Sequence, residues 1–192
     1  MTADETPSTP VRRKDAAATR AAILKAAREL FTERGYDGTG VRDIARAAAA
    51  DTRLISRYFG SKEGLFAEVV AVAFEKSMMM TPEQNAAAAR ELLTSGSQAT
   101  TDGLLLVLRS AANPRAVEIM REHLERNYQR RLADGLPGDD TMARSALLIA
   151  FCSGILTQRL ILGSRELNGA EAERLVPLLH AALDAVAQDP AS

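Results

Sequence analysis

The sequence predicts an all-α protein in two parts, a basic three-helix unit near the N-terminus and a larger helical region after it. Ala, Leu, Arg and Glu dominate while aromatic residues make up only 4%, a composition that favours helix. Apolar residues recur at three- and four-residue spacing. Residues 10–62 carry twelve Lys or Arg and six Asp or Glu, although the whole chain has a net charge of −1. This local excess suits a polyanionic partner, and a solvated helical surface is the alternative.

The first fifteen residues show no helical periodicity and end in Arg12, Arg13 and Lys14, so we expect a flexible basic tail. It serves either as an arm that reaches nucleic acid or as a solubilising segment. A first helix is expected from about Ala16 to Arg34, ended by Gly35. Its apolar stripe consists of Ile23, Leu24, Ala27, Leu30 and Phe31.

Two short helices are expected next. Thr39 is a suitable N-cap for the first. Asp51 is a suitable N-cap for the second, because its carboxylate can accept hydrogen bonds from the backbone amides in the first turn of that helix. Ile55 and Phe59 bury one face of the second helix. The opposite face carries Thr52, Arg53 and Ser56, with Arg57 at its margin. A tight turn between two short helices, braced by a longer first helix, predicts a helix-turn-helix whose second short helix enters a DNA major groove.

The remaining chain is punctuated by helix signals. Ser61 caps a fourth helix, and Thr81 opens a capping-box start followed by Pro82. Further helices are expected from Asn113-Pro114 to about 133, over roughly 140–162, and over 170–187 with Pro177 inside. The apolar segment 146–156 is too short to span a bilayer and is expected to be a buried helix.

Residues 19–66, TRAAILKAARELFTERGYDGTGVRDIARAAAADTRLISRYFGSKEGLF, resemble the DNA-binding domain of TetR/AcrR-type transcriptional repressors. The matching elements are Leu-Phe-x-x-x-Gly-Tyr, Thr39 followed by Val-x-x-Ile-Ala, and Tyr-Phe-x-Ser-Lys-Glu-x-Leu. The segment from about 104 to 187 is more loosely similar to the C-terminal domain of some members.

The resemblance implies about nine helices: a helix-turn-helix DNA-binding domain at 16–62 and a C-terminal helical ligand-binding and dimerisation domain at 63–192. It also implies a homodimeric repressor that binds a palindromic operator on double-stranded DNA and is released by a small-molecule effector. No enzymatic activity, catalytic residue or cofactor is expected. A cytoplasmic location without a membrane partner is expected, because the first residues carry Asp4 and Glu5 where a signal peptide needs cations.

The sequence departs from the family pattern in the DNA-binding part. Ala49-Ala50 stands where the family usually has Gly-Val, so the turn either avoids a glycine conformation or carries strain. Ser56 replaces a frequent Tyr of the reading helix. These departures motivate an alternative function, a helical protein-interaction module with a vestigial helix-turn-helix.

Eight residues are predicted to contact DNA. Arg53 and Arg42 are favoured as base readers, because a guanidinium matches guanine O6 and N7, with phosphate or solvent contact as the alternative. Thr39, Tyr58 and Lys62 resemble the phosphate clamps of the family. The outward face of the reading helix adds Thr52, Ser56 and Arg57.

Two further sets are predicted in the C-terminal part. If the helices meet as in the family, an effector pocket is lined by Phe74, Met78, Met120, His123, Asn127, Phe151 and Gln158, although Met residues also serve as ordinary core filling. Small residues on 144–163 allow close helix approach to a second copy. The predicted dimer interface comprises Ala150, Gly154, Thr157, Ile161 and Leu178.

No metal or nucleophile site is predicted, since Cys152, His123 and His180 do not stand at ligand spacing. Cys152 is the only cysteine and excludes an intramolecular disulfide. Its apolar surroundings favour plain packing.

Overall fold

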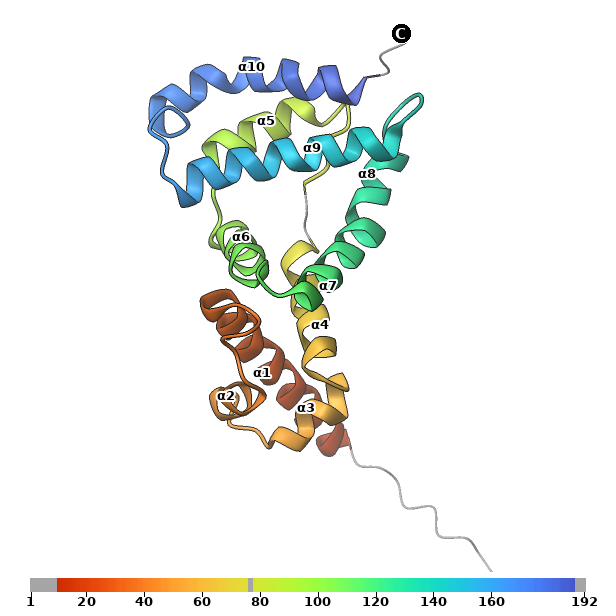
Figure 1. The fold of residues 1–192 in the computed structure, drawn as a ribbon, viewed down its shortest axis with the longest axis vertical. Coiled ribbons are helices and arrows are strands. Elements are labelled where there is room, and N and C mark those ends of the chain that lie inside the picture. Colours follow the sequence, from red (N-terminus) through yellow and green to blue (C-terminus); the bar gives the residue numbers. More distant parts are fainter. Residues whose placement is uncertain (1–9, 76–77, 189–192) are drawn as a thin grey trace, which may run out of the picture.

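The computed structural model describes residues 10–75 and 78–188, with the backbone alone for residues 10–14. Over these residues the chain forms nine continuous helices and no strand, which confirms the predicted all-α class (Figure 1). Helices α1 to α4 gather at one end, and α5, α9 and α10 lie together at the other. Helix α6 and the long α7–α8 helix connect the two ends.

The first group of helices forms the head of the molecule, which comprises α1 (Pro10–Arg34), α2 (Val41–Ala47), α3 (Thr52–Phe59) and α4 (Lys62–Phe74). Its core centres on Phe31, Tyr36 and Phe66, whose rings pack within 5.0–5.9 Å of one another. Leu106 of α6 and Ile119 of α7 belong to the same core. Residues beyond 62 therefore help to build the head.

Two boundaries of the head differ from expectation. Helix α1 begins at Pro10, so residues 10–15 are helical and not a tail, while residues 1–9 and the side chains of Arg12, Arg13 and Lys14 lie outside the description. Thr39 as an N-cap was wrong, because Gly40 holds that position in α2. The buried Thr39 hydroxyl instead donates to the carbonyls of Leu30 and Gly35, at 3.1 and 2.8 Å.

The other two predicted caps are confirmed. The Asp51 carboxylate accepts the Arg53 amide at 2.8 Å and begins α3. The Ser61 hydroxyl accepts the Gly64 amide at 3.2 Å and begins α4. Each cap satisfies one of the free amides of a helix start and fixes the direction in which the helix leaves its turn.

The second part consists of longer elements. They are α5 (Asn85–Thr94), α6 (Gln98–Ser110), α7 (Pro114–Leu124) continued by the π-helical segment η1 (Glu125–Gln129) and α8 (Arg130–Asp134), α9 (Thr141–Leu156) continued by the π-helical η2 (Thr157–Ile161), and α10 (Gly169–Ala187). The expected helix start at Thr81 was wrong, because residues 82–84 form a turn and α5 begins at Asn85. The amides of Gln84 and Asn85 both bond to the Thr81 carbonyl. Asn113 caps α7 as predicted.

Two buried arginines hold the helix α9–η2 between its neighbours. Arg144 donates to the carbonyls of Val186 and Ala187 at the end of α10, and also to those of Pro137 and Asp139. Arg159 donates to the carbonyls of Leu92 and Ser95 at the end of α5. Both guanidinium groups thus satisfy carbonyls that a helix C-terminus leaves free, where a cation is also favoured by the helix dipole.

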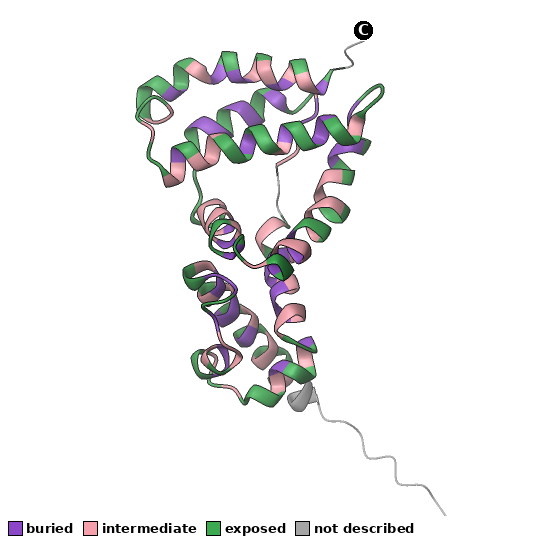
Figure 2. Cartoon of the chain, in the orientation of Figure 1, coloured by how far each residue is buried: buried purple, intermediate pink, exposed green. Residues whose placement is uncertain are grey.

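The helix from Thr141 to Ile161 is only partly buried, contrary to the expectation for its apolar segment. Its 21 residues are long and apolar enough to cross a bilayer by length and composition, a property shared with core helices of soluble proteins. Leu147 and Phe151 are 55% and 47% exposed, and Leu178 of α10 is 68% exposed. Figure 2 shows exposed residues along both helices, so a single chain leaves an apolar face uncovered.

Candidate DNA-binding surface and helical cavity

The reading helix α3 presents its polar face to solvent. Ile55 and Phe59 are buried at 1% and 8% exposure, so the helix is fixed on the head by one side. Thr52, Ser56 and Arg57 are exposed on the others, as the spacing predicted. The polar face is free to meet a groove, but contact with DNA stays a prediction.

Arg53 does not project freely from α3. Its guanidinium bonds to both oxygens of Asp51, with Nε–Oδ1 at 3.1 Å and Nη2–Oδ2 at 2.8 Å. The arginine side chain remains 90% exposed. The pKa of the Asp51 carboxyl is lowered to about 2, mainly by the side-chain hydrogen bond from Arg53. Sequence analysis recognised Asp51 as a cap and missed its second role, for which the Asp-x-Arg spacing was the available signal.

Two other exposed arginines of this surface have no ion-pair partner within the described part of the chain, Arg42 on α2 and Arg57 on α3. Arg46, also on α2, is paired with Asp43 at 3.0 Å. Arg42 and Arg57 therefore keep their full charge available for phosphate or base contact.

The predicted phosphate clamps differ in accessibility. Lys62 is half-buried, and its ammonium lies 4.2 Å from the centre of the Tyr36 ring, a cation–π contact that orients it. Tyr58 is also half-buried. Thr39 is fully buried with its hydroxyl used inside the head, so the structure offers no exposed hydroxyl there.

The turn between α2 and α3 adopts the glycine conformation with alanine in it. Ala49 has φ of +49°, the left-handed region. Its amide bonds to the Arg46 carbonyl, and the Ala50 amide bonds to the Ala45 carbonyl at 2.9 Å, which is the Schellman arrangement of a helix end. The sequence left open whether this turn avoids a glycine conformation or carries strain, and the structure shows the strained conformation.

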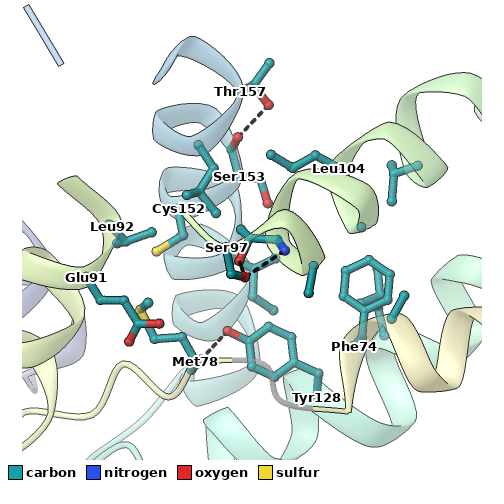
Figure 3. A pocket seen from close by; sticks show the side chains of 18 of the residues that line it. Phe74, Met78, Glu91, Leu92, Ser97, Leu104, Tyr128, Cys152, Ser153 and Thr157 are labelled. Carbon is teal, nitrogen blue, oxygen red and sulfur yellow. Dashed lines mark hydrogen bonds between the residues drawn. The ribbon is translucent and has the colours of Figure 1, made fainter. Parts of the chain in front are cut away.

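A cavity of about 400 Å³ lies between the head and the α5–α9–α10 layer (Figure 3). Its wall comes from the end of α4, from α5 and α6, from Leu124 and Tyr128 of the α7–η1 helix, and from α9–η2. The size is that of a site for a drug-sized molecule, about 300–1,000 Å³. Tyr128 bonds through its hydroxyl to the Met78 carbonyl and so holds Met78 at the cavity wall.

The cavity contains two of the seven residues predicted for an effector pocket, Phe74 and Met78. Met120 is 5% exposed and belongs to the head core. The side chains of His123 and Asn127 bond to each other at 3.0 Å, and neither residue lines the cavity. Phe151 and Gln158 are exposed on α9–η2. Asn127 and Gln158 lie within the π-helical segments η1 and η2, which shift the register of their helices, whereas Met120, His123 and Phe151 precede these segments and miss the cavity because of the way α7 and α9 pack.

The residues predicted for a dimer interface differ in their exposure. Ala150, Gly154 and Leu178 are exposed, and Ile161 is half-buried. A Cβ added to Gly154 would meet nothing within 4 Å. Thr157 instead lines the cavity and donates to the Ser153 carbonyl at 2.7 Å.

The cavity wall and the head are joined by direct contacts at the end of α6. The Tyr36 amide donates to the Ser110 hydroxyl at 3.1 Å, and Arg109 donates to the Thr32 carbonyl at 2.7 Å. Gly35 fits against the Arg109 backbone so closely that an added Cβ would lie 2.2 Å from its carbonyl oxygen. Helix α6 therefore reaches from the cavity, at Leu104, to the α1–α2 turn.

Two family models match the chain. One, described as bacterial regulatory proteins of the tetR family, matches residues 23–69. The other, described as a tetracyclin repressor-like C-terminal domain, matches residues 83–186, more than half of the chain. Together they cover both the head and the region that carries the cavity.

Among curated proteins, the transcriptional repressor NicS of Pseudomonas putida is 42% identical over 66 residues, which cover 34% of this chain and 31% of that protein. The repressor Rv3405c of Mycobacterium tuberculosis is 46% identical over 50 residues, 26% of this chain and 27% of that protein. The chain thus spans about a third or less of the length of these relatives.

Solved structures resemble the whole chain. A TetR-family regulator from Streptomyces coelicolor is 24% identical with a TM-score of 0.52, over 97% of this chain and all of that one. One from Rhodococcus is 18% identical with a TM-score of 0.67, over 90% of this chain and all of that one. At these identities the likeness concerns the fold.

Proposed function

This chain belongs to the tetR family of bacterial regulatory proteins, and from that membership we propose that it is a cytoplasmic, homodimeric repressor. The repressor would bind an inverted-repeat operator and leave it when a small molecule binds to the protein. Members of the family are transcriptional regulators with a DNA-binding helix-turn-helix and are not enzymes. The observation that carries the proposal is the reading helix α3, buried on its apolar side and open on the side that bears Arg53 and Arg57.

On the DNA side, the proposed base readers are Arg53 and Arg42, with Lys62 and Tyr58 on phosphates. The Asp51–Arg53 pair supports this assignment, because it occupies the Nε edge of the guanidinium and leaves Nη1 free to face a base. Arg42 and Arg57 add unpaired charge on the same two helices, which favours a polyanion.

The proposed dimer uses the exposed faces of α9 and α10. Leu147, Phe151 and Leu178 leave apolar surface in water on one chain, and packing against a second copy about a two-fold axis would cover it. Gly154 allows close approach of the two α9 helices. The two-fold axis would present two reading helices about 34–36 Å apart, as an inverted repeat requires.

The proposed release starts at the cavity. Helix α4 runs from Lys62 in the head to Phe74 in the cavity wall, and α6 runs from the cavity to the α1–α2 turn. A molecule that occupies the cavity displaces these two helices and so changes the spacing of the reading heads. The proposed DNA-binding domain at 16–62 and the proposed effector-binding and dimerisation domain at 63–192 are joined by α4, whose buried side chains belong to the core of the head.

The test begins with selection of bound fragments from the source genome by the full chain, followed by titration of the selected duplex at several salt concentrations. We expect a log–log salt slope of several units, since each phosphate contact releases counterions. Absence of salt-dependent duplex binding would refute the repressor and favour the protein-interaction module.

The dimer is tested separately with Gly154→Arg, which places a bulky charge on the proposed interface. We expect monomers with unchanged helix content and weak operator binding, because each monomer holds one half-site. Sedimentation of a wild-type monomer at micromolar concentration, or of a dimeric variant, would contradict the interface.

A further inference from the structure

The side chains of Asp51 and Arg53 form a fixed pair at the start of the reading helix. The Asp51 carboxylate accepts the Arg53 backbone amide at 2.8 Å, which caps α3. The same carboxylate accepts the guanidinium, with Nε–Oδ1 at 3.1 Å and Nη2–Oδ2 at 2.8 Å. Two parallel hydrogen bonds between planar groups hold the guanidinium in one orientation. Because the cap ties the carboxylate to the backbone, α3 itself sets the direction of the Arg53 side chain.

The pair uses one edge of the guanidinium and leaves another. An arginine side chain has five N–H donors, and the Nε–H and one Nη2–H of Arg53 are bonded to Asp51. Among the described residues, no acceptor meets the other donors of this guanidinium. One N–H of Nη1 and one of Nη2 point in parallel along the outer edge of the group. This outer edge matches the O6 and N7 acceptors that guanine presents in the major groove.

Arg53 also stands at the position from which a helix-turn-helix reads bases. It is the second residue of α3, and the N-terminal residues of a recognition helix contact base edges. Ile55 and Phe59 are buried on the other side of α3, so the helix is held with the pair outward. Helices α2 and α3 lie at the end of the molecule away from α10 (Figure 1), and the Arg53 side chain is 90% exposed.

The pairing makes Arg53 a poorer partner for a phosphate than for a base. The Asp51 carboxylate, 2.8 Å from Nη2, offsets much of the guanidinium charge that an anion would experience. It also occupies the Nε edge, which is one of the edges that can hold a phosphate through two hydrogen bonds. Guanine O6 and N7 carry partial charges only, so the carboxylate repels them far less. Arg42 and Arg57 have no ion pair among the described residues and supply the charge for phosphates.

We propose that Asp51 makes Arg53 a selective reader of guanine. Asp51 aims the outer edge of the guanidinium at O6 and N7 of one guanine in each operator half-site and keeps the arginine away from phosphates. Arg53 makes the contact, and Asp51 is a positioning residue that determines specificity. This rests on the proposed operator-binding function and specifies the base that the reading helix recognises.

The test uses the full chain and the duplex selected from the source genome. Each guanine of a half-site is replaced in turn by 7-deazaguanine, which lacks the N7 acceptor but still pairs with cytosine. We expect one guanine whose replacement weakens wild-type binding about fivefold and has no effect on binding by Arg53→Ala. Replacement of any other guanine should affect the two proteins equally.

Asp51→Asn tests the positioning role, because asparagine remains a good helix cap but cannot accept the same two guanidinium bonds. In this variant the effect of 7-deazaguanine at the same position should fall below about twofold. Binding to a random duplex should become about threefold tighter, with a salt slope steeper by about one, since the released arginine reaches a phosphate. A variant that had merely lost its fold would bind every duplex more weakly, a change of the opposite sign.

Asp43→Asn is the matched control, because Asp43 pairs with the exposed Arg46 at 3.0 Å on the neighbouring helix α2. It removes the same charge from the same surface, so it should strengthen binding to operator and random duplexes alike and leave the 7-deazaguanine effect unchanged. A half-site without any guanine coupled to Arg53, or an Asp51→Asn variant with the full 7-deazaguanine effect, would overturn the proposal. An equal loss of that effect in Asp43→Asn would overturn the assignment of Asp51 and reduce the change to net charge.

These outcomes are separable from a failure of the proposed function. If the chain binds duplex DNA with a steep salt dependence but no guanine is coupled to Arg53, operator binding stands and the guanine assignment is wrong. If the chain binds no duplex at all, both the proposed function and the guanine assignment are overturned.

Discussion

The left-handed alanine in the turn between α2 and α3 makes a stability prediction that needs no ligand or DNA. Ala49 lies at φ of +49° in the position after a helix end that glycine most often occupies. Its Cβ is crowded against the carbonyl there, at a cost of about 1–2 kcal/mol. Glycine removes that cost and adds unfolded-state entropy of about 0.4–1 kcal/mol. Ala49→Gly should therefore stabilise the chain by a net ~0.5–1 kcal/mol.

The measurement is the thermal unfolding midpoint by circular dichroism at one fixed protein concentration, since association would otherwise move it. A stabilisation of ~0.5–1 kcal/mol corresponds to a rise of roughly 1–4 °C for a chain of this size. The control is Ala50→Gly, one residue later, where φ is not positive. There glycine brings the entropy cost and also removes a methyl group that packs against the head core, so the midpoint should fall.

The sign of the difference between the two variants decides the argument. If Ala49→Gly unfolds at or below the wild-type temperature, alanine carries no strain at this turn. If both glycines raise the midpoint, the gain has a cause other than the left-handed conformation. Either result would refute left-handed strain at Ala49 as a cost to the stability of the chain.

Four further predictions concern the DNA-binding surface and the cavity. Lys62→Ala should weaken binding to specific and random duplexes about equally and lower the salt slope by about one, because a phosphate contact carries no sequence information; a changed sequence preference alone would contradict it. Asp51→Asn keeps a good helix cap but releases the Arg53 guanidinium, so the ratio of operator to random-duplex affinity should fall, as parallel titrations would reveal. Arg53 lowers the pKa of Asp51 from 3.8 to about 2. The stabilisation of α3 by the Asp51 carboxylate is therefore present above about pH 4 and is lost as the pH falls toward 2, and the Asp51→Asn variant should show no such loss in an acid titration. Burial raises the pKa of the Cys152 thiol to about 12, so iodoacetamide should alkylate it slowly at pH 8 compared with the unfolded chain, and rapid alkylation would show that the cavity opens to solvent.

The sequence predicted the head well because its signals are local. Asp51 and Ser61 each cap the helix that follows them within three residues, and the buried positions Ile55 and Phe59 are one helical turn apart. Thr39 failed as a cap for a non-local reason. Its hydroxyl meets the Leu30 and Gly35 carbonyls at the end of α1, a contact that depends on how the chain turns back on itself.

The cavity was predicted poorly because it is assembled from helices distant in sequence. Two features decided its wall, the break at residues 95–97 that separates α5 from α6 and the π-helical segments in the α7–α8 and α9 helices. A π-helical segment adds a residue to the turn, so a side chain assigned by 3.6-residue periodicity points elsewhere beyond it. Gln158 lies within η2 and illustrates this, whereas Phe151 precedes η2 and is exposed on α9. Phe74 and Met78 were found because Phe74 ends α4 and Met78 follows it closely in the sequence.

Helix α6 explains how occupancy of the cavity can reach the reading helix. Its first half lines the cavity at Thr100 and Leu104, and its last residues hold the α1–α2 turn through Ser110 and Arg109. Gly35 leaves no room between that turn and the Arg109 backbone, so the two cannot slide past each other without a steric clash. Closely packed contacts of this kind transmit a displacement instead of absorbing it. In the proposed dimer, a ligand that pushes α6 outward would therefore move the head with it and change the position of α3 relative to the second copy in the same step.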